Sequence, residues 1–245
     1  YSGASGFMEL ATPQSGEELA ALLAEAAAAH RTVNVGGQFS KNRMGGPVHA
    51  ADLIVSTSRM RNVLQYEPRD LTVSVQAGMP LAELNRLLGE NGQMIPLDPV
   101  WAADGTVVGV LAANCSGSRR RLYGTARDIV IGMQFATLEG KLVQSGGMVV
   151  KNVAGLDMSK LLIGSFGTLA AITVVNVKLF PKPPGQRSYL LRFDTAAAAG
   201  ERAREVLGSV LQPVAIDLFN PAAAEELGVG PSWVLAIQAA GTEGV

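Results

Sequence analysis

A cluster of prolines divides this 245-residue sequence into two parts. Residues 181–185 read Pro-Lys-Pro-Pro-Gly and follow a stretch rich in β-branched residues, 168–180, which predicts a long strand. Because proline lacks a backbone N–H, neither a helix nor a central strand can continue through the cluster. The sequence therefore predicts one domain over residues 1–183 and a second over residues 184–245.

The first part mixes helices and strands without strict alternation. Ser15 and Glu18 fit a capping box ahead of an apolar stripe, which predicts a helix. Short strands are expected over residues 32–35, 52–56 and 71–76. Further expected elements are a helix from Pro80 to Gly89, a short apolar helix capped by Thr106, a hairpin around Glu139-Gly140 and a helix capped by Asp157. This order disfavours a doubly wound sheet and predicts an α+β fold.

Residues 184–245 start the pattern again. We expect a strand over 189–193, an Ala-rich helix over 196–207 and two more short strands. This second domain is also α+β.

Composition narrows the classes of partner and the compartment. The 20 Lys and Arg balance the 21 Asp and Glu, so no global charge favours nucleic acid. The single Cys115 excludes an intrachain disulfide and indicates a reducing compartment. The longest uncharged stretch, 161–177, contains glycines and polar residues that suit a turn and a strand better than a membrane span. We find no pattern of a secretory signal and expect a cytoplasmic protein.

The loop 36–46 is the first segment that could bind a ligand. Its four glycines let backbone N–H groups turn inward towards phosphate oxygens, Ser40 and Asn42 add polar side chains, and Lys41 and Arg43 add positive charge. Neither the Walker A spacing nor the dinucleotide fingerprint is present. An ordinary glycine-rich surface turn remains the alternative.

Three more segments carry weaker signals. Small residues over 104–114 permit close approach of a flat ring, although a tightly packed core helix explains them equally well. Arginines 119–121 and Arg127 could contact a carboxylate or a partner protein, or lie on a solvated face. Residues 151–157 and 164–169 complete the set, the latter as Gly-Ser-Phe-Gly-Thr-Leu.

The order and spacing of these segments resemble the PCMH-type FAD-binding domain, the fold of vanillyl-alcohol oxidase and other FAD-linked oxidases. Within that family, residues 116–128 and 146–157 are similar to the FAD-binding subunits of glycolate oxidase. The resemblance implies two α/β subdomains with FAD in a groove between them, followed by a partial, ferredoxin-like α+β substrate or cap domain. Leu156 stands where the family usually carries tyrosine, so this chain departs from the family pattern at that position.

The resemblance also implies which residues bind the cofactor. The loop 36–40 would hold the pyrophosphate, residues 106–114 would also contact FAD, and the backbone near Ile172 would approach the pyrimidine edge of the flavin. The full implied set is Val35, Gly36, Gly37, Gln38, Phe39, Ser40, Pro99, Thr106, Gly109, Ala112, Asn114, Gly117, Tyr123, Gly124, Asp128 and Ile172.

The link to FAD is expected to be non-covalent. Family members with a covalent flavin often carry histidine directly after the paired glycines, where this chain has Gln38, whose amide cannot form the bond. We interpret His30 and His49 as solvated or structural residues and Cys115 as a small buried residue. We assign no catalytic residue and no metal ligand, because no base stands out from the scattered carboxylates.

The leading hypothesis is an FAD-binding subunit of a glycolate oxidase-like complex that oxidises a 2-hydroxy acid, with the flavin accepting hydride or relaying electrons. The resemblance implies a catalytic flavoprotein subunit and an iron–sulfur subunit as partners, and peripheral association with the inner face of the plasma membrane. Two alternatives remain open: a self-sufficient FAD-linked oxidase of another hydroxy acid or alcohol, and a non-catalytic scaffold. A reductase of UDP-N-acetylenolpyruvylglucosamine, which shares the fold, is disfavoured because its C-terminal catalytic signatures are not evident in these residues.

Overall fold

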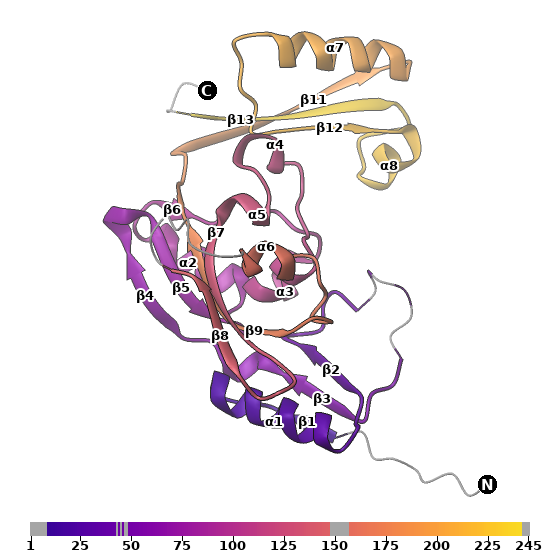
Figure 1. Ribbon diagram of the computed structural model, residues 1–245. Coiled ribbons are helices and arrows are strands. Elements are labelled where there is room, and N and C mark those ends of the chain that lie inside the picture. Colours follow the sequence, from indigo (N-terminus) through magenta and orange to yellow (C-terminus); the bar gives the residue numbers. More distant parts are fainter. Residues whose placement is uncertain (1–8, 43, 45, 47–48, 148–156, 242–245) are drawn as a thin grey trace, which may run out of the picture. The chain divides into compact units, whose positions relative to one another are not determined.

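The computed structural model describes residues 9–42, 44, 46, 49–147 and 157–241 (Figure 1). The described chain forms two compact units. The first comprises Tyr1–Ile95, Pro99–Ser116 and Thr125–Phe180, and the second Pro96–Asp98, Gly117–Gly124 and Pro181–Val245. Arg43 and most of the segment 151–157, both singled out above, lie outside the described residues.

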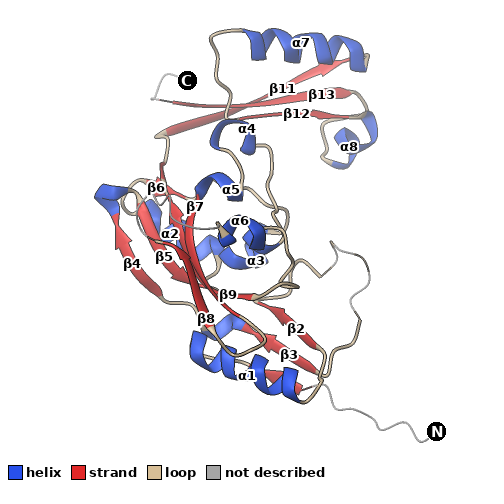
Figure 2. Cartoon of the chain, viewed as in Figure 1, coloured by secondary structure: helices blue, strands red, loops and turns tan. Residues whose placement is uncertain are grey.

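Strands and helices alternate irregularly through both units (Figure 2). The first unit holds β1 (Glu9–Ala11), α1 (Gly16–Ala28), β2 (Val33–Gly36), β3 (Leu53–Ser56), β4 (Val63–Glu67), β5 (Thr72–Gln76), α2 (Leu81–Gly89), β6 (Gln93–Met94), α3 (Val107–Ala112), α5 (Ala126–Ile129), β7 (Val130–Ala136), β8 (Leu142–Gly146), α6 (Met158–Leu162) and β9 (Ala171–Lys178). Short 3-10 turns occupy Thr57–Arg59, Pro68–Asp70 and Ala102–Asp104, and β10 (Phe180–Pro181) lies at the boundary between the units. This mixed α/β composition confirms the predicted fold class.

Helix α1 and a small parallel sheet of order β1-β3-β2 form the N-terminal layer. Ser15 caps the helix, because its Oγ accepts a hydrogen bond from the N–H of Glu18 at 3.1 Å. The capping box differs from the prediction, since the Glu18 carboxylate accepts from the N–H of Gln14 at 2.8 Å. The apolar stripe of α1 is buried together with strand β3, with Leu19, Leu23, Leu53 and Val55 in one core cluster.

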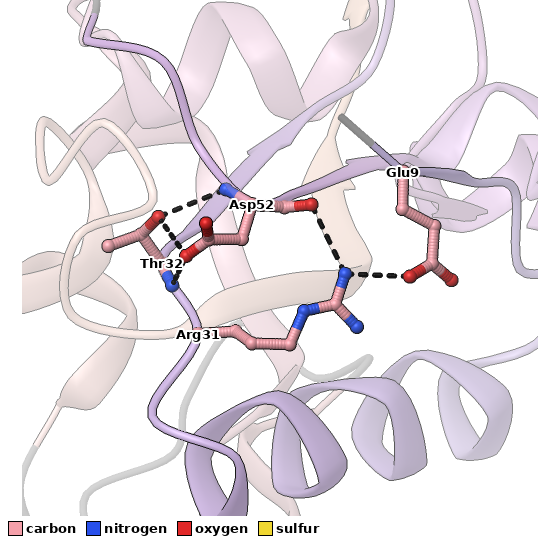
Figure 3. Close-up of polar contacts among 4 residues, drawn as sticks. All are labelled: Glu9, Arg31, Thr32 and Asp52. Atoms are coloured by element: carbon pink, nitrogen blue, oxygen red, sulfur yellow. Dashed lines mark hydrogen bonds and ion pairs between the residues drawn. The ribbon is translucent and has the colours of Figure 1, made fainter. Parts of the chain in front are cut away.

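Four residues tie the starts of these strands together (Figure 3). The N–H and hydroxyl of Thr32 both donate to Asp52 Oδ2 at 2.8 Å, and the N–H of Asp52 donates to Thr32 Oγ1 at 3.0 Å. Arg31 donates to Glu9 Oε2 at 2.6 Å and to the carbonyl of Asp52 at 3.1 Å. Because β2 and β3 are parallel, their carboxyl ends lie together at the end of the sheet opposite this cluster. A ligand-binding loop can begin there.

The second layer is a five-stranded antiparallel sheet of order β4-β5-β9-β7-β8. Val73, Val75, Val175 and Val177 of its central strands are fully buried. Helix α3 contacts β9, and helix α6 contacts β7 and β8. The predicted hairpin is confirmed, with Gly140 at φ 75° in the turn between β7 and β8.

Several predicted bounds differ from the structure. The strand expected from residue 168 begins at Ala171, because residues 164–168 form a turn in which Gly164, Phe166 and Gly167 have positive φ. Strands β1, β4, β6 and β10 and helices α4, α5 and α8 were not predicted, and most of them are too short to give a periodic signal.

The second unit is a three-stranded antiparallel sheet of order β11-β13-β12. Its elements are α4 (Arg120–Tyr123), β11 (Gly185–Phe193), α7 (Ala196–Gly208), β12 (Ala215–Phe219), α8 (Pro221–Glu226) and β13 (Trp233–Gly241). Helices α7 and α8 both contact β12 and β13. Val234 and Leu235 of the central strand are buried.

In the part of the chain that the structure describes, no helix is both long enough and apolar enough to cross a bilayer.

Candidate functional site

The glycine-rich loop begins where strand β2 ends. Two of its carbonyl groups accept hydrogen bonds from the end of β3 and the 3-10 turn that follows it: Ser56 Oγ donates to the carbonyl of Gly37 at 2.9 Å and Thr57 Oγ1 to that of Gly36 at 3.4 Å. By contrast, the N–H groups of residues 37–40 donate no hydrogen bond to any other described residue. The loop thus keeps a row of backbone donors available for a ligand that accepts hydrogen bonds.

Close packing explains both glycines at the start of the loop. A β-carbon on Gly36 would lie 2.5 Å from Cε1 of Phe39, whose ring covers that position. A β-carbon on Gly37 would lie 2.5 Å from Oγ1 and Cγ2 of Thr106. The loop is therefore pressed directly against the start of helix α3.

Thr106 fixes the start of α3 as the sequence predicts. Its Oγ1 accepts from the N–H of Gly109 at 3.1 Å, and the N–H of Val107 donates to the carbonyl of Met79 at 2.8 Å. The buried side chains of Val107, Val110 and Leu111 anchor the helix in the core. Its small residues Gly109 and Ala112 line a cavity together with the glycine-rich loop.

The turn 164–168 is attached to the other end of α3. The N–H of Gly164 donates to the carbonyl of Leu111 at 3.2 Å, and that of Phe166 donates to the carbonyl of Ala112 at 2.9 Å. The chain then enters β9, where Ile172 is buried and pairs with Phe135 of β7. Two segments that lie far apart in sequence, the glycine-rich loop and the turn that leads into β9, therefore converge on α3.

Together these segments enclose a cavity of about 630 Å³ within the first unit, inside the range of small-molecule and cofactor sites. Its described lining is Asn34, Val35, Gly36, Gly37, Gln38, Phe39, Ser40, Lys41, Asn42, Gly46, Thr57, Thr106, Val108, Gly109, Ala112, Ala113, Ser165, Phe166, Gly167, Thr168, Ala170, Ala171 and Ile172. Phe39 and Phe166 both have left-handed backbones, with φ of 55° and 52°. Such conformations are uncommon for side chains of this size and concentrate at ligand sites.

Comparison with known proteins identifies the family of this chain. Residues 9–146, more than half of the chain, match the family model described as an FAD binding domain. The chain belongs to this family. The glycine-rich loop and α3, the segments that enclose most of the cavity, fall within the matched residues.

Relatives of this FAD-binding domain agree with that assignment. The chain is 35% identical over 181 residues to the glycolate oxidase subunit GlcE of Escherichia coli (strain K12), covering 74% of this chain and 50% of the relative. It is 28% identical over 209 residues to the glycolate oxidase subunit GlcD of Bacillus subtilis (strain 168), covering 85% and 44%. This chain thus spans half or less of these relatives.

The fold is shared with a solved structure of alkyldihydroxyacetonephosphate synthase, at a TM-score of 0.79 and 23% identity. The superposition covers 95% of this chain and 47% of that protein.

The cavity brings together most of the residues that the sequence indicates for cofactor binding. Those that line it are Val35, Gly36, Gly37, Gln38, Phe39, Ser40, Thr106, Gly109, Ala112 and Ile172. Six of the indicated residues do not line it: Pro99, Asn114, Gly117, Tyr123, Gly124 and Asp128. The lining from the turn, residues 165–168, was not indicated residue by residue, although its glycine pattern was part of the resemblance.

The residues outside the cavity have other neighbours. Asp128 lies in the first turn of helix α5, where the N–H of the capping residue Thr125 at 2.7 Å and its hydroxyl at 2.9 Å donate to the carboxylate and lower its pKa. Gly117, Tyr123 and Gly124 belong to the second unit. There the N–H of Gly117 donates to Asp98 Oδ1 at 2.9 Å.

The arginine run also belongs to the second unit. Arg119 donates to Gln186 at 3.5 Å and Arg121 to the carbonyl of Pro213 at 3.0 Å, while Ser118 donates to the carboxylate of Asp217. These contacts hold the segment 117–124 on the three-stranded sheet. Arg127, in the first unit, donates to the carbonyl of Lys160 at 2.9 Å. Three of the four candidate arginines thus have a structural partner.

The histidines and the cysteine lie where the sequence places them. His30 and His49 are exposed, and His30 follows α1 in a left-handed conformation with φ 52°. Cys115 is buried just after α3, and its N–H donates to the carbonyl of Val110 at 3.0 Å.

Proposed function

We propose that this chain binds FAD non-covalently in the cavity described above and serves as the FAD-binding subunit of a glycolate oxidase-like flavoprotein. The observation that carries the proposal is the row of N–H groups over residues 37–40, which face no described partner and border a cavity of cofactor size. A diphosphate offers several oxygens that accept hydrogen bonds, so it suits these donors.

The residues divide the work of holding the cofactor. The loop 36–40 would bind the diphosphate, and Thr106 would keep α3 and the loop at their present spacing. Small residues such as Gly109 and Ala112 would leave space for a flat ring, and the backbone near Ile172 would meet the edge of the flavin. When bound, FAD supplies an acceptor for hydride or for electrons from a partner.

Non-covalent binding is supported by the chemistry of the lining. A stable bond to the flavin needs a nucleophilic side chain, and residue 38 is a glutamine. Among the described residues that line the cavity, none is a histidine, cysteine or tyrosine. The cofactor would therefore be held by hydrogen bonds and packing alone.

The same lining supports a role in a complex that oxidises a 2-hydroxy acid. Hydride removal from such a substrate requires a base for the hydroxyl proton, and the described lining contains no aspartate, glutamate or histidine. The base would then come from outside this cavity. A catalytic flavoprotein subunit, with an iron–sulfur subunit as electron acceptor at the inner face of the plasma membrane, fits this arrangement and the two glycolate oxidase relatives.

Acid precipitation of the purified protein tests the proposal. We expect flavin absorbance before treatment and yellow FAD in the supernatant afterwards. Flavin that stays with the pellet would disprove the non-covalent link. A protein that remains colourless after incubation with FAD would disprove cofactor binding itself.

A further inference from the structure

Lys41 differs from every other described residue that lines the cavity, because it alone carries a charge. The remaining lining consists of glycine, apolar side chains and neutral polar side chains. Lys41 directly follows the loop whose N–H groups have no described partner. The only described side-chain charge of the site is therefore adjacent to its row of backbone donors.

The contacts of Lys41 leave its charge without an ion-pair partner. Its Nζ donates to the carbonyl of Val100 at 2.9 Å and to Ser40 Oγ at 3.3 Å, and it lies 5.8 Å from the ring centroid of Trp101. None of these groups is anionic, and no described carboxylate lies within ion-pair distance of Nζ. An ammonium group has three N–H donors, so two are used and one remains.

Partial burial removes some of the water around the ammonium group of Lys41. Burial lowers the pKa of Lys41 from its ordinary value of 10.5, while Cys115 and Asp104 act in the opposite direction. A cation that has lost part of its water gains more from a charged acceptor than an exposed one does. An anionic group in the cavity would therefore bind Lys41 more strongly than it would bind a surface lysine.

We infer that Lys41 recognises the diphosphate of the cofactor and makes the cavity select nucleotides that carry a diphosphate over uncharged flavins. The inference rests on the proposed function. If Lys41 has this role, its substitution weakens the binding of charged ligands only. If Lys41 instead only fixes the loop 36–42 to the carbonyl of Val100, its substitution weakens the binding of all ligands alike.

The test compares three ligands with the full-length apoprotein. FAD is measured by titration, and ADP and riboflavin by competition against FAD. ADP carries the diphosphate without the flavin, and riboflavin carries the flavin ring without phosphate. We expect Lys41→Met to weaken FAD and ADP by about tenfold, the scale of one lost charge-assisted hydrogen bond, and to leave riboflavin unchanged.

Charge retention and salt provide two further readouts. Lys41→Arg keeps the positive charge and should retain most of the affinity for ADP. In the wild type, ADP binding should weaken between about 0.1 M and about 1 M salt, over which the Debye length falls from about 10 Å to about 3 Å. Riboflavin binding should not weaken, and this measurement needs no variant. Lys41→Met should show a shallower salt dependence for ADP.

Lys178 supplies the matched control. Its Nζ lies 5.2 Å from the ring centroid of Phe180, a similar cation–π contact, but it does not line the cavity. Lys178→Met should leave all three affinities unchanged. Equal weakening of ADP and riboflavin in Lys41→Met would overturn the inference, as would unchanged affinity for FAD and ADP. A wild type that binds no FAD would instead overturn the proposed function.

Discussion

Gly37 and Thr106 touch so closely that a β-carbon on the glycine would lie 2.5 Å from two side-chain atoms of the threonine. The first residue belongs to the loop after β2 and the second caps α3, so this contact sets the spacing between the two main walls of the cavity. Only a residue without a side chain allows it.

Gly37→Ala should therefore widen this spacing and weaken FAD binding. The added methyl group meets a β-branched side chain that also caps a helix, so the loop must shift. Overpacking of this kind costs about 1–3 kcal/mol, and we expect FAD affinity to fall by about tenfold or more in a fluorescence titration.

Gly89→Ala is the control for that substitution. Gly89 ends α2, and a β-carbon there would meet nothing within 4 Å. Its FAD affinity should equal that of the wild type. An unchanged affinity in Gly37→Ala would show that the loop and α3 are not spaced by this contact.

A second glycine supports the cavity from behind. A β-carbon on Gly78 would lie 1.9 Å from the carbonyl oxygen of Thr57, which lines the cavity, and the N–H of Gly78 donates to the carbonyl of Met60 at 2.7 Å. Because the obstacle is backbone, no rotamer change can relieve it. Gly78→Ala should destabilise the first unit by about 3 kcal/mol.

Tryptophan fluorescence can follow this unit separately. The chain has two tryptophans, Trp101 in the first unit and Trp233 in the second. In a Trp233→Phe background, Trp101 reports urea unfolding of the first unit alone. Gly208→Ala is the control. Gly208 ends α7 in the second unit, and a β-carbon there would meet nothing within 4 Å, so the urea midpoint of the first unit should equal that of the parent. A Gly78→Ala midpoint equal to the parent would contradict the steric argument.

The features that the sequence predicts well are those set by neighbours along the chain. Ser15, Thr106 and Asp157 each accept a hydrogen bond from an N–H three residues later, so a short motif is enough to locate the helix start. The glycine-rich loop can be predicted for the same reason, because its glycines lie close together along the chain. The contact between Gly78 and Thr57 is not, since it depends on how two turns cross in space.

The sequence also gives no sign that the segment 117–124 belongs to the second unit. Its hydrogen bond from Ser118 to Asp217 joins residues 99 positions apart. For the same reason Gly117, Tyr123 and Gly124 could be indicated by family resemblance but not placed. Three consecutive arginines could be a binding patch or a solvated face in the sequence, and only the fold shows that Arg119 donates to Gln186 of β11 and Arg121 to the carbonyl of Pro213, just before β12.

The bond between Ser118 and Asp217 should protect this segment from proteolysis. Loss of one hydrogen bond of about 1 kcal/mol would raise the open population about fivefold, exposing the bonds after the arginines at positions 119–121 to trypsin. Ser118→Ala and Asp217→Ala should each speed cleavage there by about that factor. If the two residues act through this bond, the double variant should be no faster than the single ones. A double variant that is cleaved faster by the product of the two single factors would contradict the pairing.

Acid should weaken the strand-start cluster drawn in Figure 3. The N–H of Thr32 and then its hydroxyl stabilise the charged carboxylate of Asp52 and hold its pKa below the ordinary value of 3.8. A depressed pKa contributes stability that is complete above the unfolded value and disappears as pH falls through the folded value. The contribution of Asp52 should therefore be constant above about pH 5 and be lost below about pH 4.

Asp52→Asn tests this sign directly, in the same Trp233→Phe background. Asparagine keeps one acceptor oxygen but cannot carry the charge, so the variant should be less stable at neutral pH, and the difference from the parent should shrink as the pH falls below 3.8. Asp70→Asn, at an exposed carboxylate of the same unit, should run parallel to the parent. A difference for Asp52→Asn that stays constant down to about pH 2 would mean that Thr32 does not favour the charged form. The stability of the N-terminal layer would then depend on the packing of α1 against Leu53 and Val55 rather than on this charge.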